Sequence, residues 1–283
     1  MLTKDAGAPA QLTERGKKVV DAPRRRVAQA REISSGKSLL LGLLGIVSVL
    51  LVWEVASRQG WINPLVLSSP SGIWEGGRDL IEQGVLGPAL LSTARLFALG
   101  MGISLAGGLL LGVIIGWYPI ANAVLDPWVS ILYASPRIAF IPLIAVWFGP
   151  GLTGQIVIVV LIAIFPVVIN VAAGVRAVDR DMFKMARSSL ATNRDVLLTV
   201  ALPGAVPAVA SGVRQGVMQG LLGVVVAEYF LGNTGVGGII FQAGLTLRTG
   251  QALLGAFVFA VAALLATSLL KAIEKRLDKW RTS

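Results

Sequence analysis

Long apolar runs alternate with short polar connections along most of this chain. A helix needs about 20 apolar residues to cross the hydrocarbon core of a bilayer, and six runs reach that length. They cover residues 38–57, 90–117, 127–148, 152–174, 204–231 and 251–272. Hydrophobic residues make up 55% and charged residues 14% of the 283 residues, and the mean hydropathy is +0.76. The pattern predicts an all-α, polytopic membrane protein with six transmembrane helices in residues 38–283.

Positive charges are concentrated in alternate connections. Nineteen of the 25 Lys and Arg residues lie in the two tails and in the connection 174–203, whereas the connections 58–87 and 232–251 together hold three. Cytoplasmic segments of membrane proteins carry the excess of Lys and Arg. The sequence therefore predicts a multi-pass protein of a bacterial inner (plasma) membrane, with both termini in the cytoplasm. With this distribution, the net charge of +10 does not favour nucleic-acid binding.

The first 37 residues form a basic tail that we expect to be disordered and cytoplasmic. It lacks the apolar core of about 7–15 residues that defines a secretory signal. Two interpretations of the three arginines at 24–26 are open. They contact anionic lipid head groups, or, as we favour, they only fix the topology of the first helix.

The chain contains no cysteine and no histidine. Disulfides, thiolate chemistry, imidazole bases and the common zinc sites are therefore excluded, and we expect no metal site. Residues 31–38 read REISSGKS and end like a phosphate-binding loop, but Arg31 stands in place of its first glycine and no buried strand precedes it. The glycine-rich segment 232–238 is better explained by a flexible turn outside the membrane than by a dinucleotide site. We predict no cofactor on this chain.

The polar segment before the fifth apolar run carries the clearest motif. Residues 184–203 read KMARSSLATNRDVLLTVALP. The spacing resembles the loop that marks the membrane subunits of ATP-binding-cassette (ABC) importers, in which Glu-Ala-Ala is followed by a glycine and later by an aliphatic residue and Leu-Pro. The matching residues are Ala186, Val200, Leu202 and Pro203. Lys184, Met185 and Leu190 stand in place of the glutamate, the first alanine and the glycine.

Four further stretches extend this resemblance from about Ser68 to the C-terminal tail. They are SSPSGIW at 68–74, STARL at 92–96, IPLIAVWFGPG at 141–151 and VVVAEYFLGNTGVGGII at 224–240. Together they resemble the nitrate, sulfonate, taurine and bicarbonate branch of the type I ABC importer permeases. The resemblance implies the six-helix permease core and a transport subunit without enzymatic activity of its own.

The resemblance also implies an assembly. Two permease subunits, which we expect to be copies of this chain, would stand in the lipid bilayer on a cytoplasmic dimer of ABC ATPases, and an extracytoplasmic solute-binding protein would deliver the substrate. ATP and Mg²⁺ would bind to the ATPases. The 174–203 loop would dock on them through a helix at 179–190, with an apolar patch flanked by charges. The residues expected in this coupling contact are Asp179, Met182, Phe183, Lys184, Met185, Ala186, Arg187, Leu202 and Pro203.

Five ionisable side chains lie within or at the edges of the apolar runs: Glu54, Arg95, Arg137, Arg214 and Glu228. Charge there costs several kcal/mol unless it is paired or hydrated. Arg137 and Arg214 lie near mid-depth with no acid at matching depth, so we place them, with Glu228, on the path of a small anion. Pairing with helix carbonyls is the alternative. Glu54 and Arg95 are expected to pair with each other or lie at the interface, and Glu228 to pair with an arginine.

Two sets of glycines repeat every four residues within apolar runs. They are Gly108, Gly112 and Gly116, and Gly212, Gly216 and Gly220. Glycines at this spacing share a helical face and let another backbone approach closely. We expect both helices in the interior, where the glycines either line the path or the subunit contact, or pack within one subunit.

Three prolines interrupt apolar runs. Pro136, Pro142 and Pro166 each remove a backbone donor. They predict that the third and fourth spans are kinked or broken.

These features predict a permease that moves a small anion, such as a sulfonate, a carboxylate or an inorganic oxyanion, into the cytoplasm by ATP-driven alternating access. A secondary transporter for such an anion, without an ATPase partner, is the alternative. We would expect it to couple through acids at mid-membrane. A membrane-embedded enzyme is disfavoured because the chain has no His, no Cys and few acids.

Overall fold

The computed structural model describes residues 35–178, 180–232 and 234–278. The chain divides into two compact units between Val52 and Trp53. Helix α2 (Ser35–Arg58) runs through this boundary, and all later elements belong to the second unit. The described residues form helices and turns and no strand, which confirms the predicted all-α class.

Five described helices are long and apolar enough to cross a membrane, and a sixth span results if one bent pair counts as a single span. The spans are α2, α4 (Leu86–Trp117), the pair α5 (Pro119–Ala134) and α6 (Ile141–Phe148), α7 (Leu152–Arg176), α10 (Leu202–Leu231) and α12 (Thr249–Asp278). Each overlaps one of the six predicted runs. Four shorter helices occupy the connections: α3 (Pro70–Glu82), α8 (Arg180–Ser188), α9 (Asn193–Val196) and α11 (Val236–Leu245).

The third span is broken, as its prolines predict. Its two halves meet at 90°. A residue before proline is pushed out of the helical region, and Ser135, before Pro136, has an extended backbone with ψ of 147°. A short 3₁₀ turn, η1 (Arg137–Phe140), then leads into α6. Pro142 lies in the first turn of α6, where its missing N–H needs no partner.

The fourth span, by contrast, is unbroken. Helix α7 continues through Pro166 to Arg176, so the expected break is absent here. Proline leaves the carbonyl four residues earlier without its helical donor, and at Ile162 the Arg137 guanidinium approaches that oxygen to 3.4 Å. Asn170 donates its side-chain amide to the Pro166 carbonyl at 2.8 Å. Side chains thus supply hydrogen bonds around the proline.

The fifth span begins earlier than its apolar run. The helix starts at Asn193, where Thr192 and Asp195 form a reciprocal capping box. A π-helical turn, η2 (Leu197–Ala201), joins α9 to α10 just before Pro203. The loop predicted at 174–203 therefore ends at Thr192. The capping box starts the helix there, although the residues that follow are polar.

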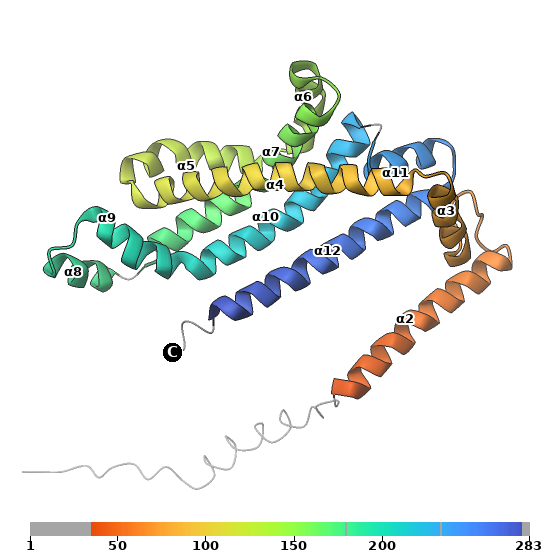
Figure 1. The fold of residues 1–283 in the computed structure, drawn as a ribbon, viewed down its shortest axis with the longest axis horizontal. Coiled ribbons are helices and arrows are strands. Elements are labelled where there is room, and N and C mark those ends of the chain that lie inside the picture. Colours follow the sequence, from red (N-terminus) through yellow and green to blue (C-terminus); the bar gives the residue numbers. More distant parts are fainter. Residues whose placement is uncertain (1–34, 179, 233, 279–283) are drawn as a thin grey trace, which may run out of the picture. The chain divides into compact units, whose positions relative to one another are not determined.

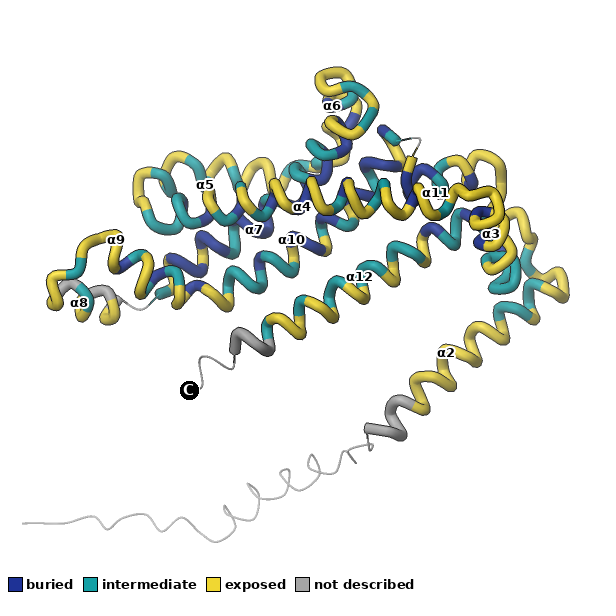
Figure 2. Tube along the Cα trace, in the orientation of Figure 1, coloured by how far each residue is buried: buried dark blue, intermediate teal, exposed yellow. Residues whose placement is uncertain are grey.

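Helix α7 forms the centre of the second unit and packs along both α4 and α10 (Figures 1 and 2). Val159, Val167 and Val171 on α7 have no exposed surface. Both glycine stripes contact this helix. A Cβ added at Gly112 would lie 2.6 Å from the Val171 Cβ, and one at Gly216 would lie 2.7 Å from the Val167 Cγ2. Valine side chains therefore occupy the space that the glycines leave open, within one subunit.

Helices α3 and α11 lie in segments that the sequence analysis treated as loops. Both pack against α12 near its first residues (Figure 1). Charges and glycines interrupt the apolar pattern in these segments, which hides helices of only ten to thirteen residues.

The glycine contacts lead to a paired prediction on α4. Gly112→Ala should lower the free energy of unfolding by about 1–3 kcal/mol, because the new methyl overlaps Val171. Gly102→Ala is the matched control, since nothing lies within 4 Å of an added Cβ there, and alanine is the better helix former by up to about 1 kcal/mol. Thermal unfolding of the purified chain should show a lower Tm for the first variant only. An equal or higher Tm for Gly112→Ala would contradict the tight α4–α7 contact.

Candidate functional site

Helix α8 presents apolar side chains to its surroundings. Met182 and Met185 are 48% and 65% exposed. Ala186, the next residue, is half-buried. Lys184 forms an ion pair with Asp181 at 2.8 Å. Of the other residues predicted for the coupling contact, Asp179 and the side chains of Phe183 and Arg187 lie outside the described part of the chain. Within this chain, α8 is a short amphipathic helix whose methionines have little to pack against.

The turn after α8 requires a left-handed residue, and that residue is Leu190. Its φ is 59°. The Ala191 N–H donates to the Ala186 carbonyl, which is the closing bond of a Schellman motif. Glycine adopts this conformation freely, whereas another residue pays about 1–2 kcal/mol. Leu190 stands where the ABC importer loop has glycine. The left-handed turn is formed all the same, with backbone strain at the leucine.

Leu202 and Pro203 lie within a continuous helix and do not end a loop. They follow the π turn η2 and form the first residues of α10. A π turn inside a helix changes its register by one residue and is common at functional positions. The Leu-Pro pair thus joins the α9 end of the helix to its membrane-spanning part.

Arg137 is held by uncharged partners. Its guanidinium lies 3.4 Å from the Ile162 carbonyl oxygen and 5.1 Å from the centre of the Tyr133 ring. No described carboxylate pairs with it, so no acidic side chain of the described residues balances its charge. The predicted alternative for the arginines, contact with helix carbonyls, applies to Arg137.

Arg214 has an acidic partner, which the sequence analysis did not foresee. Its guanidinium lies 3.5 Å from the Glu274 Oε2, and both side chains are partly buried. The expectation that no acid matches its depth is therefore wrong. It failed because α12 remains helical past residue 272, which places Glu274 beside α10. The Glu274 Oε1 is buried without a hydrogen bond.

Glu228 is buried and binds neutral donors instead of the predicted arginine. It is 1% exposed, and the Thr93 hydroxyl lies 2.8 and 3.0 Å from its two oxygens. The Gly237 N–H donates to its Oε2 at 2.8 Å, and the Val236 N–H donates to the Thr93 hydroxyl at 2.9 Å. Val236 and Gly237 begin α11, so these two side chains cap its free N–H groups.

Glycines fit around this carboxylate. Gly235 has a φ of 90°, and a Cβ there would lie 2.1 Å from the Glu228 Oε1. A Cβ at Gly237 would lie 2.7 Å from the Glu228 Cβ. The segment predicted to be a flexible turn is thus a tight cradle at Gly235 and Gly237, which only glycine can form. Thr93 and these glycines belong to the STARL and GNTGVGG stretches, but their mutual contact could not be inferred from either stretch alone.

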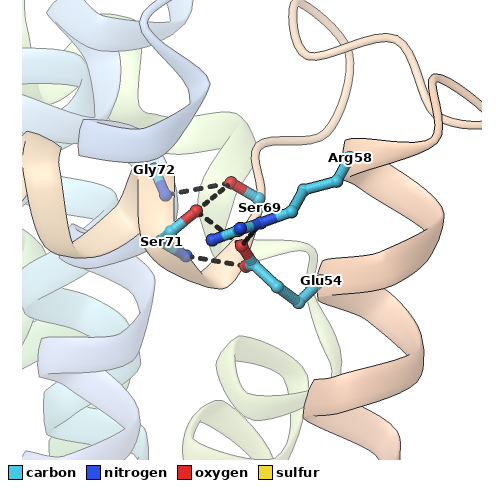
Figure 3. A network of polar contacts seen from close by, with 5 residues as sticks. All are labelled: Glu54, Arg58, Ser69, Ser71 and Gly72. Carbon is cyan, nitrogen blue, oxygen red and sulfur yellow. Dashed lines mark hydrogen bonds and ion pairs between the residues drawn. The ribbon is translucent and has the colours of Figure 1, made fainter.

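Glu54 has a similar role at α3 (Figure 3). Its carboxylate accepts hydrogen bonds from the Ser71 N–H at 3.0 Å and the Ser71 hydroxyl at 2.8 Å, and it pairs with Arg58 at 2.6 Å. Ser69 caps the same helix by accepting from the Gly72 N–H at 3.0 Å. The predicted pairing of Glu54 with Arg95 is therefore wrong. The SSPSGIW stretch supplies this N-terminal cap, with Pro70 in the first turn.

Comparisons with known proteins identify chains that are similar to this one. The family described as "Binding-protein-dependent transport system inner membrane component" matches residues 108–281. SsuC of Bacillus subtilis, a permease protein named for aliphatic sulfonates transport, is 33% identical, with 86% of this chain and 88% of the relative covered. The taurine transport system permease protein TauC of Escherichia coli is 30% identical, with 90% and 94% covered. A chain of the inward-facing MetNI methionine ABC transporter is 22% identical with a TM-score of 0.47, covering 72% of this chain and 94% of that one, and this likeness is too low to carry a structural argument.

The cap on α11 can be tested by removing its acceptor. Glu228→Ala should destabilise the chain by about 2–4 kcal/mol, because it strands the Gly237 N–H and the Thr93 hydroxyl in an apolar setting. Glu228→Gln keeps one acceptor oxygen and should cost less. Thermal unfolding and amide hydrogen exchange in α11 are the measurements. The control is Glu75→Ala, on the exposed surface of α3, which should change the free energy of unfolding by no more than about 0.5 kcal/mol. If Glu228→Ala is as stable as this control, the cap is contradicted.

Proposed function

Because the chain belongs to the family of binding-protein-dependent transport system inner membrane components, we propose that it moves a small sulfonate-type anion across the membrane. It is a multi-pass transport subunit and not an enzyme; ATP hydrolysis belongs to a partner ATPase. The strongest support for an anionic substrate within the chain is Arg137, a membrane arginine with only uncharged partners. Two relatives are named for sulfonate and taurine transport, which supports the same substrate class.

We place the translocation path beside Arg137. A cation with no counter-ion in an apolar region favours the transient presence of an anion, since that anion lowers the cost of the buried charge. Arg214 contributes less net charge because Glu274 lies 3.5 Å away. Glu228 accepts hydrogen bonds from α4 and α11, so its role is to hold those two helices in position beside the path.

We propose that α8 couples this subunit to the ATPase dimer. The exposed Met182 and Met185 fit an apolar groove on a partner, and Lys184 with Asp181 borders them. The basic excess of the tails and of the 174–203 segment supports a cytoplasmic position for α8 and both termini. ATP and Mg²⁺ would then bind on the ATPase.

The substrate site would open alternately to the two sides of the membrane through rigid-body movement of packed helices. The α4–α7–α10 group moves as one body, because glycines and valines interlock along it. The broken span α5–α6 supplies a joint, since no helical hydrogen bonds run across Ser135 and Pro136. A second permease subunit, a copy of this chain, and an extracytoplasmic solute-binding protein complete the importer.

A charge on the apolar face of α8 tests the coupling. Met182→Asp should lower ATP-driven uptake into proteoliposomes and weaken co-purification of the ATPase by at least about tenfold, because a desolvated carboxylate costs a few kcal/mol. Gln83→Asp adds the same charge at an exposed residue that follows α3, in a different connection from α8, and should leave both near wild type. Similar behaviour of the two variants would contradict docking through the methionines.

Removal of the Arg137 charge tests the anion path. Arg137→Gln keeps a donor for the Ile162 carbonyl but loses the charge, so the uptake kcat/KM for ethanesulfonate should fall about ten- to a hundredfold. The neutral isostere ethanesulfonamide should be transported poorly by wild type, and the variant should discriminate less between the two. Arg78→Gln, at an exposed residue paired with Glu82, is the control. Preference of the wild-type importer for the sulfonamide would refute an anionic substrate.

A further inference from the structure

Three of the sequence stretches meet at a cavity that the proposed function has not used. It has a volume of about 600 Å³ and lies where α4 and α7 begin and α10 ends. Ser92 and Arg95 from STARL line one wall, Gly151 from the FGPG turn lines another, and Gly232 and Thr234 follow α10. Gln155, on the first turn of α7, completes the lining.

Arg95 gives this cavity its charge. It is the one charged residue among the described residues of the lining, and no described carboxylate pairs with it. Glu228, the nearest acid along α10, is already bound by Thr93 and Gly237 and is not part of the lining. The cavity therefore carries a net positive charge, and Arg95 has its guanidinium donors available for a ligand.

Gln155 is a buried polar side chain without a partner. The residue is 5% exposed, and its amide makes no hydrogen bond within the described chain. Part of this amide is open to the cavity, so its hydrogen-bonding groups are available to a ligand there. A Cβ at Gly232 would lie 2.3 Å from the Gln155 Nε2, so glycine at 232 is what leaves room for the amide.

Other donors converge on the same space. The Ser92 and Thr234 hydroxyls lie 3.5 Å apart across the lining. Helix α7 starts at Leu152, after Gly151, with no side chain capping its first turn, so its free N–H groups and the positive end of its dipole add to the field. An oxyanion with several acceptor oxygens matches a guanidinium, an amide, two hydroxyls and a helix N-terminus.

We propose that this cavity receives the sulfonate group of the substrate before the anion reaches Arg137. The proposal rests on the proposed function and adds a binding site to it. Arg95 binds the sulfonate oxygens, and Gln155 with the two hydroxyls orients them. The four charged or polar side chains come from two helices, α4 and α7, and the α10–α11 turn, so the site exists only in the folded subunit.

Labelling of a single cysteine tests occupancy directly, since the chain has no cysteine of its own. Ser92→Cys in the assembled importer, in nanodiscs, should react with a neutral maleimide severalfold more slowly when ethanesulfonate is added, and at an unchanged rate with ethanesulfonamide. Arg78→Cys, outside the cavity, should be unaffected by either compound. Labelling that responds only to added phosphatidylglycerol would assign the cavity to lipid head groups and overturn the proposal, as would labelling that ethanesulfonate leaves unchanged.

Charge replacement at position 95 separates binding from structure. Arg95→Cys should raise the KM for ethanesulfonate uptake about ten- to a hundredfold, while the subunit still assembles with its ATPase. Treatment with aminoethyl methanethiosulfonate restores a positive charge and should recover most of the loss, whereas the sulfonatoethyl reagent should not. Equal effects of the two reagents, or a KM that does not change, would overturn the role of Arg95. If wild type imports ethanesulfonate normally in that case, the proposed function stands and only this site is lost.

Discussion

An N–H group at the start of a helix has no partner within that helix, and in an apolar setting each one left bare costs several kcal/mol. This chain contains two short helices, α3 and α11, that begin among membrane spans. Carboxylates from two spans satisfy their first turns: Glu54 binds Ser71, and Glu228 binds Gly237. Backbone N–H groups and neighbouring hydroxyls thus stabilise both carboxylates, and Arg58 also pairs with Glu54. The positions of α3 and α11 against α12, and the walls of the Arg95 cavity, depend on these two contacts.

The middle of the second unit is held by apolar packing and not by hydrogen bonds to helix ends, since it contains almost no polar groups. Helix α7 presents valines to glycines on α4 and α10, so the backbones approach closely. One side-chain hydrogen bond, from Asn170 to Gln215 at 3.3 Å, joins α7 to α10. Between its two ends, α7 carries one polar side chain, Asn170 near Pro166. Arg137, from η1, supplies a second donor there. Close packing makes the group stiff. Movement is left to the segments at its edges, namely the broken span and α8.

The sequence was sufficient to predict the spans, because the length of an apolar run is read directly from the sequence. Pro136 also predicted the break in the third span. It was insufficient for α3 and α11, whose glycines and charges mask a helical pattern. Contacts between distant residues were also out of reach. Thr93 and Glu228 are far apart in the chain, and Glu274 reaches Arg214 only because α12 extends beyond its apolar run. The left-handed Leu190 could be suspected from the glycine of the resembling loop, yet only the backbone shows that the turn is kept.

The cavity lined by Arg95 and Gln155 has walls made from helix ends and turns, with none of the buried valines of α7. Its shape can therefore change through substitutions at Ser92 or Thr234 without disturbing the packed core. Such positions are open to adaptive change at little risk to folding. On the proposed role of the cavity, a lineage of transporters with this architecture would be able to shift from one oxyanion to another in single mutational steps, with Arg95 kept for charge while its neighbours set the size of the organic group.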